Sequence, residues 1–118
     1  RGFSVNIGQI RSAGDVNRAF GEVLDDVVAG EAALITRYRR PYAIITPEKP
    51  EDVDPESIKK ITTTEFMREN GFFLQEAHAG QWFVLTRHDQ KSAWLGPIDM
   101  DDMEFLVLKR DLMKKREE

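Results

Sequence analysis

The sequence has no cysteine, only two histidines and no apolar run close to the length of a membrane span. The lack of cysteine excludes disulfides, thiol nucleophiles and thiolate metal sites, and it is compatible with the cytoplasm, which is the location we expect. His78 and His88 are the only histidines, and no cysteine is available as a further zinc ligand. We therefore predict neither a zinc site nor any other cofactor. A membrane helix needs about 18 or more apolar residues, so we predict no membrane contact.

The usual sequence motifs of catalysis are also missing. The chain contains no P-loop, no dinucleotide-binding glycine pattern and no Ser-His-Asp order with a glycine elbow. We therefore predict that the protein is not an enzyme. Of its 118 residues, 41% are apolar and 32% are charged, which is typical of a soluble globular protein. This length suffices for one domain, or for two small units that must pack together to be stable.

An internal repeat with an offset of 50 residues is the main feature that the sequence does contain. Residues 12–47 align without a gap with residues 62–97, and most pairs that differ keep their physical type, as Leu34 and Val84 do. Two copies of a unit in one chain can pair as the subunits of a homodimer do. The identical pairs are Arg18–Arg68, Gly21–Gly71, Leu24–Leu74, Ala29–Ala79, Gly30–Gly80, Thr36–Thr86, Arg37–Arg87, Ala43–Ala93 and Pro47–Pro97.

Each copy predicts helical structure followed by a β-hairpin. Residues 12–15 and 62–65 begin with a hydroxyl and end with a carboxylate, which is the capping-box pattern of a helix start. Gly30 and Gly80 are expected to end the helices. We expect helix breaks at Gly21 and Asn70-Gly71, leading strands at 3–7 and 58–61, hairpin strands at 32–36, 42–46, 82–86 and 93–96, and turns at 37–41 and 87–91.

The boundaries of the copies follow from composition. We assign residues 1–47 to the first repeat, the acidic residues 48–60 to a linker, residues 61–97 to the second repeat and residues 98–118 to a terminal helix. Asp99 and Asp102 are expected to cap that helix, and its apolar start, Met103–Leu108, is expected to pack on the second repeat. The fold class predicted is α+β.

Bulky aromatic residues distinguish the second hairpin from the first. Trp82, Phe83 and Trp94 occupy the positions of Ala32, Ala33 and Ile44. Aromatics on a small sheet are usually core or interface residues. We therefore expect the two hairpins to interlock, with these aromatics filling the space that the alanines leave.

The run from Gly30 to Pro47 resembles the Phd/YefM antitoxin family, whose units read Gly-Glu, an apolar run, Ile-Thr-Arg, a basic turn, and Pro-x-Ala before an apolar strand. The preceding residues 20–24 are also similar to the family, and residues 58–106 resemble it more loosely. The resemblance implies two α+β units that pair as an intramolecular pseudo-dimer, bind operator DNA through one edge of the pair, and carry a C-terminal segment that silences a toxin.

Arginines in the first turn are the leading candidates for DNA contact. Guanidinium groups on a short turn reach phosphates and base edges, although an exposed turn can also be charged without any such role. The first unit is expected to dominate, because Asp89 in the second turn would repel a phosphate. An imperfect palindrome is the expected operator. The candidate DNA-binding residues are Arg37, Arg39, Arg40, Arg18, Arg11 and Ser12, with Arg68 and Arg87 as the weaker half.

The terminal helix raises a different possibility, that of a protein-binding module. Its apolar residues Met103, Leu106, Val107 and Met113 suit a partner protein, such as a toxin, that the chain would neutralise without binding DNA. The acidic net charge of −4 favours this alternative over nucleic acid. The sequence leaves open a monomeric pseudo-dimer and a homodimer.

Overall fold

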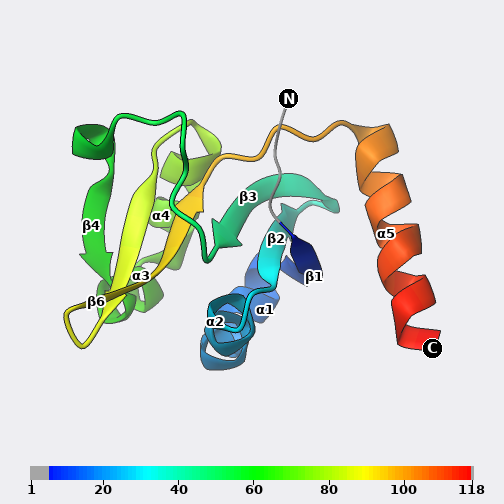
Figure 1. The fold of residues 1–118 in the computed structure, drawn as a ribbon, viewed down its shortest axis with the longest axis horizontal. Coiled ribbons are helices and arrows are strands. Elements are labelled where there is room, and N and C mark those ends of the chain that lie inside the picture. Colours follow the sequence, from blue (N-terminus) through cyan, green and yellow to red (C-terminus); the bar gives the residue numbers. More distant parts are fainter. Residues whose placement is uncertain (1–5, 118) are drawn as a thin grey trace.

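The computed structural model describes residues 6–117, which form one six-stranded mixed sheet with five α-helices (Figure 1). The predicted α+β class is confirmed. In chain order the elements are β1 (Ile7–Ser12), α1 (Ala13–Arg18), α2 (Phe20–Val28), β2 (Ala32–Arg37), β3 (Arg40–Thr46), the 3-10 helix η1 (Pro55–Ser57), β4 (Lys59–Thr62), α3 (Thr63–Arg68), α4 (Asn70–His78), β5 (Phe83–Arg87), β6 (Gln90–Gly96) and α5 (Asp102–Glu117).

The sheet order is β1-β2-β3-β6-β5-β4, so each half of the chain supplies three adjacent strands. In both halves the leading strand runs parallel to the first hairpin strand, and the hairpin is antiparallel. The halves meet at an antiparallel seam between β3 and β6 that has three residue pairs, centred on Ile45 and Leu95. The elements α1, α2 and β3 are matched by α3, α4 and β6 at the 50-residue offset of the sequence repeat.

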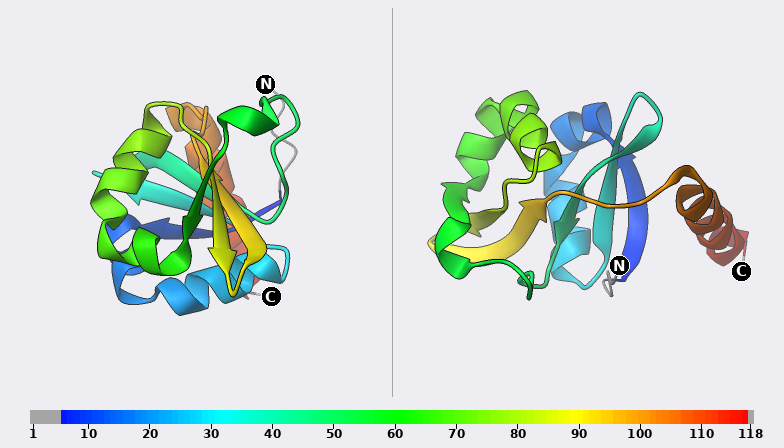
Figure 2. Two further views of the ribbon diagram at one scale, coloured as in Figure 1. Left: turned by 90° about the vertical axis from the view of Figure 1, so that its left-hand side faces the viewer. Right: turned by 90° about the horizontal axis from the view of Figure 1, so that it is seen from above.

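One apolar core is shared by the two halves. Helices α1–α4 pack on one face of the sheet (Figure 2), and their buried side chains form a single cluster with alternate residues of the hairpin strands. An aromatic contact links the halves through the helices, because the rings of Phe20 and Phe66 lie 4.9 Å apart. Phe66 continues to Phe73, and Phe73 to Phe83 on β5. The halves therefore depend on each other for burial.

The predicted helix caps are confirmed in both halves. The Ser12 hydroxyl accepts a hydrogen bond from the Asp15 amide at 3.1 Å, and the Thr62 hydroxyl accepts one from the Glu65 amide at 3.0 Å. Both carboxylates in turn accept a hydrogen bond from the backbone amide of the cap residue. At the other end, Gly30 has φ 117°, a conformation that favours glycine and closes a helix.

The helix break is not at the predicted glycines. Ala19 leaves helical geometry with φ −131° and ψ 40°, and Glu69 does so with φ −136° and ψ 49°. Gly21 and Gly71 lie inside the helices that follow. The break turns α2 so that Phe20 and the apolar residues after it face the core along with Val16 of α1.

The leading strand of the first half also differs from the prediction. Strand β1 begins at Ile7 and ends at Ser12, where α1 starts, whereas the expected strand covered residues 3–7, of which 3–5 lie outside the described residues. In the second half, β4 starts at Lys59, within the segment assigned to the linker. Each leading strand thus runs directly into its helix cap.

The hairpin turns are shorter than predicted. Only Tyr38-Arg39 and His88-Asp89 connect the strands, and all four residues have positive φ, between 54° and 63°. Two residues with positive φ are the geometry of the type I′ turn, which matches the twist of the flanking strands. Arg37 and Arg40 accordingly belong to the strands and pair with each other.

Helix α5 is capped and placed differently from the prediction. Its cap is Asp101, whose carboxylate accepts a hydrogen bond from the Glu104 amide at 2.8 Å. The helix lies beside β1 and β3 of the first half, not on the second half, and Figure 1 shows it beyond β1, away from α3 and α4. Phe105 is buried, whereas Met103, Leu106 and Val107 are exposed. The apolar start of α5 therefore packs through one face only.

The aromatics of the second hairpin also contact different neighbours. Trp82 lies against Gly96 of the same half, because a Cβ built on Gly96 would come within 2.3 Å of the Trp82 ring. Phe83 joins the shared core through Phe73. The ring contacts between the halves are made by Phe20 with Phe66 and by Tyr42 with His78, rather than by these hairpin residues.

Candidate nucleic-acid interface

The tip of the β2–β3 hairpin gathers the three arginines of the first turn. Arg37 is the most constrained of them, because its Nη1 donates a hydrogen bond to the Tyr42 hydroxyl at 3.3 Å. Its guanidinium also lies 5.5 Å from the Tyr38 ring centre and 5.4 Å from that of Tyr42. Both distances are within the range of cation–π attraction. Arg37 therefore has a fixed position between two aromatic rings.

Arg39 and Arg40 extend from the tip into solvent. Arg40 forms an ion pair with Asp102 at the start of α5, with 3.6 Å between the charged atoms. Both side chains of this pair are largely exposed, so the pair adds little to stability and opens easily. Arg39 forms no hydrogen bond or ion pair within residues 6–117. Two of the three guanidinium groups are thus accessible to an anionic ligand.

The start of α1 lies at the same end of the sheet. Ser12 is the register partner of Thr36, the residue before Arg37. The Arg18 guanidinium folds back along α1 and pairs with Asp15. The cap therefore brings a carboxylate into this region as well, and the Ser12 hydroxyl is already engaged as an acceptor.

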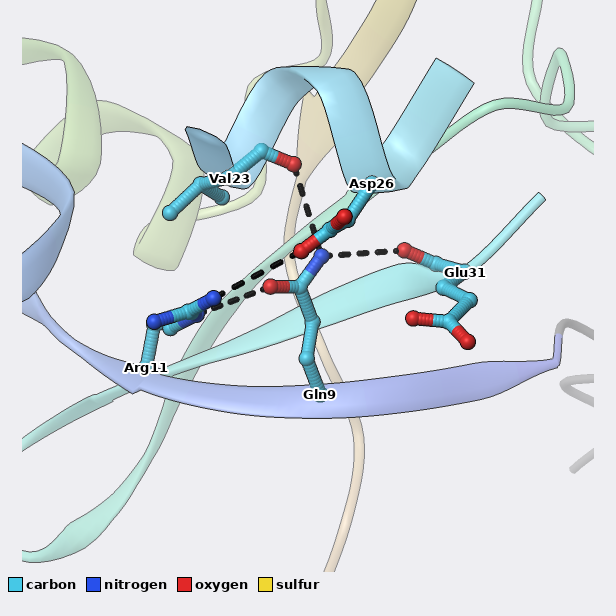
Figure 3. Close-up of polar contacts among 5 residues, drawn as sticks. All are labelled: Gln9, Arg11, Val23, Asp26 and Glu31. Carbon is cyan, nitrogen blue, oxygen red and sulfur yellow. Dashed lines mark hydrogen bonds and ion pairs between the residues drawn. The ribbon is translucent and has the colours of Figure 1, made fainter. Parts of the chain in front are cut away.

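Arg11 is part of a polar network between β1 and α2 (Figure 3). Its Nε donates to the Gln9 side chain at 2.8 Å, and its Nη2 lies 3.5 Å from the Asp26 carboxylate. The Gln9 amide donates in turn to the carbonyl oxygens of Val23 and Glu31. This network satisfies a buried glutamine and fixes the edge strand to the helix, so Arg11 has a structural role in the fold.

The second half places its candidate residues at the opposite end of the sheet. Strands β3 and β6 are antiparallel, so the two turns point away from each other along the strands. Arg87 is 3.7 Å from Asp25 of α2, an ion pair that joins the halves. Arg68 forms no ion pair or hydrogen bond among the described residues. The structure therefore brings the first-turn arginines together but does not bring Arg87 or Arg68 to them.

Tyr38 is a feature of this tip that the sequence analysis missed. Its side chain is 83% exposed and its φ is 55°. Behind it, the Tyr42 ring stacks on His78 of α4 with 4.1 Å between ring centres, and His78 Nδ1 lies 3.0 Å from the Tyr42 carbonyl oxygen. The signal in the sequence was an aromatic residue enclosed by arginines at Arg37, Arg39 and Arg40.

The candidate partner-binding residues are exposed on α5, and Met113 among them also borders β1. Met103, Leu106, Val107 and Met113 are between 44% and 68% exposed. A groove of about 370 Å³ separates α5 from β1, with Ile10 and Leu112 in its lining. The groove is mixed in character, because its lining also includes Arg11, Glu31, Lys109 and Lys115.

Metal-binding clusters and membrane-spanning helices are both absent from residues 6–117. No group of three or more acidic or histidine side chains within residues 6–117 is placed to hold a metal ion. Over the same residues, none of the helices has the length and apolar character required to cross a bilayer.

Comparisons of the chain with protein-family models, with curated proteins and with solved structures find no match.

Proposed function

We propose that the protein is a DNA-binding transcriptional repressor of the Phd/YefM type, in which two antitoxin-like units pair within one chain as a pseudo-dimer. The observation that carries the proposal is the exposed tip with Arg37, Arg39 and Arg40, whose one carboxylate partner among the described residues is the exposed Asp102. Guanidinium groups bind phosphates and guanine edges in bidentate geometry. The proposal includes autoregulation, in which the protein represses its own promoter.

The operator that we propose is an imperfect palindrome, because the two halves of the chain repeat one unit with different residues at the hairpin tip. The two tips lie at opposite ends of the sheet and point away from each other, so they do not enter neighbouring grooves on one face of a straight duplex. The second tip carries Asp89 and pairs Arg87 with Asp25. The first half would therefore dominate binding, with Arg68 and Arg87 contributing less. Arg18, Arg11 and Ser12 would have a smaller part than the tip, because each already has a partner within the molecule.

A salt titration of duplex binding tests this proposal. A protein that neutralises phosphates loses affinity linearly with the logarithm of salt concentration, with a slope of about −0.9 per phosphate. Arg39→Ala is expected to weaken binding several-fold and to make the slope shallower by about 1. Lys49→Ala, which removes an exposed positive charge outside the tip, is the matched control. Equal affinity and slope for Arg39→Ala and wild type would refute the assignment of this turn.

A protein-binding antitoxin or immunity module is the second candidate function. It is favoured by the exposed apolar residues on α5, of which Leu106 and Met113 line a shallow apolar groove with Lys109. Apolar helix faces of this kind insert into grooves on partner proteins. This function predicts weak duplex binding at every salt concentration. It also predicts co-purification with the product of a neighbouring gene, which Leu106→Asp should abolish.

A further inference from the structure

The residues at the β2–β3 tip are not those that its backbone favours. Both turns need two residues with positive φ, and Asn-Gly or Asp-Gly is the usual solution because these residues tolerate that conformation. Histidine and aspartate at 88 and 89 are close to this preference, since Asn, Asp and His are enriched in the left-handed region. Tyr38 and Arg39 adopt nearly the same angles, φ 55° and 63°, without this advantage. The fold therefore does not explain their presence.

The Tyr38 ring has no packing role that would compensate. It is 83% exposed, and the Arg37 guanidinium lies behind it at 5.5 Å from the ring centre. That guanidinium is fixed by Tyr42, which is itself stacked on His78 of α4. The ring is thus held at the end of a chain of contacts that reaches the second half of the molecule, with its outer face open to solvent.

We propose that Tyr38 is a base-contacting residue: the hairpin tip enters the major groove of duplex DNA and the Tyr38 ring contacts the edge of a base, while the flanking arginines bind phosphates. This inference rests on the proposed function. A two-stranded ribbon fits the major groove, and the thymine methyl group exposed there offers an apolar contact to an aromatic ring. The Arg37 guanidinium lies behind the Tyr38 ring, and no carboxylate within residues 6–117 pairs with it. Its positive charge would therefore lie close to the DNA when the ring is in the groove.

The alternative role for Tyr38 would be to position Arg37 only. The two roles differ in their salt dependence, because a contact to a base changes affinity without releasing counterions, whereas displacing an arginine from a phosphate also reduces the salt slope. Removing a side chain that contacts a base edge costs about tenfold in affinity. Tyr38→Phe keeps the ring and should therefore keep most of the affinity.

The experiment starts with selection of wild-type ligands from duplexes that contain roughly 20 randomised base pairs, about two helical turns. Fluorescence anisotropy then measures affinity for the enriched duplex at several salt concentrations. Tyr38→Ala is expected to bind about tenfold more weakly with an unchanged salt slope. His88→Ala, at the equivalent backbone position of the other tip, is the matched control and should bind as wild type does.

The other outcomes contradict either the base contact of Tyr38 or the proposed DNA-binding function. If Tyr38→Ala binds as tightly as wild type while Arg39→Ala binds weakly with a shallower slope, Tyr38 does not contact a base but the proposed function stands. If Tyr38→Ala reduces the salt slope as Arg39→Ala does, its role is to position Arg37. If wild-type protein shows no salt-dependent binding to any duplex, the proposed function fails, and this inference with it.

Discussion

Replacing Phe20 with alanine tests whether the two halves share one core. Phe20 is 3% exposed and lies 4.9 Å from Phe66 of the other half. Truncation of a buried phenylalanine costs about 3–5 kcal/mol, because the lost contacts are only partly recovered by relaxation. For a domain of this size 1 kcal/mol corresponds to roughly 4 °C in Tm. We therefore expect Tm to fall by roughly 10–20 °C.

The distribution of fluorophores makes this prediction specific to the shared core. Both tryptophans, Trp82 and Trp94, are in the second half, whereas Phe20 is in the first. Tryptophan fluorescence therefore reports the unfolding of the half that was not mutated. If the core is shared, the fluorescence transition should move with the far-UV circular dichroism transition, as two-state unfolding requires.

The control for this experiment is Phe72→Ala. Phe72 is 54% exposed on α4, so its loss should shift Tm by no more than a few degrees. A tryptophan transition that stays at the wild-type temperature in Phe20→Ala, beside a separate early transition by circular dichroism, would refute the shared core. The same result would also remove the structural basis for treating the halves as a pair.

Two further substitutions test the tips and the Trp82 contact. The double variant Tyr38→Asn with Arg39→Gly replaces two residues that are unfavourable at positive φ. It should raise the free energy of unfolding by about 1 kcal/mol, measured by chemical denaturation, and weaken duplex binding, measured by anisotropy. A stabilised variant with full affinity would contradict the proposed role of the tip. Gly96→Ala brings a Cβ within 2.3 Å of the Trp82 ring and should destabilise by about 1–3 kcal/mol. Gly71→Ala, in α4 with open space around it, should instead stabilise by up to about 1 kcal/mol; a stabilising Gly96→Ala would show that the ring moves aside freely.

Local features of the fold were predictable from the sequence because they depend on residues close together in the chain. The caps at Ser12 and Thr62 need only a hydroxyl and a carboxylate three positions later. The ends of the helices at Gly30 and Gly80 need only a residue that accepts positive φ. The helix break was misplaced because Ala19 and Glu69 carry no local breaking signal. The position of the break depends instead on how α2 packs against the sheet, which is a long-range contact.

Long-range features were not predictable, because nothing local specifies them. The seam of three residue pairs at Ile45 and Leu95 sets the two arginine-bearing turns at opposite ends of the sheet, and the alternation of apolar residues is compatible with other registers. Likewise, the apolar residues of α5 indicated a helix that packs somewhere but not which sheet edge it meets. The partners of the arginines, Asp25, Asp26 and Asp102, come from distant elements and were not foreseen.

The short seam between β3 and β6 has a consequence for how these molecules associate. Few backbone hydrogen bonds join the halves, and the segment between Thr46 and Lys59 is the covalent tether that connects them across the seam. The first half of one molecule could meet the second half of another and rebuild the same contacts, since the surfaces are identical. Exchange of this kind is an inexpensive route to dimers. The length of the tether thus becomes a control on assembly: shortening it should favour reciprocal exchange over closure within one molecule.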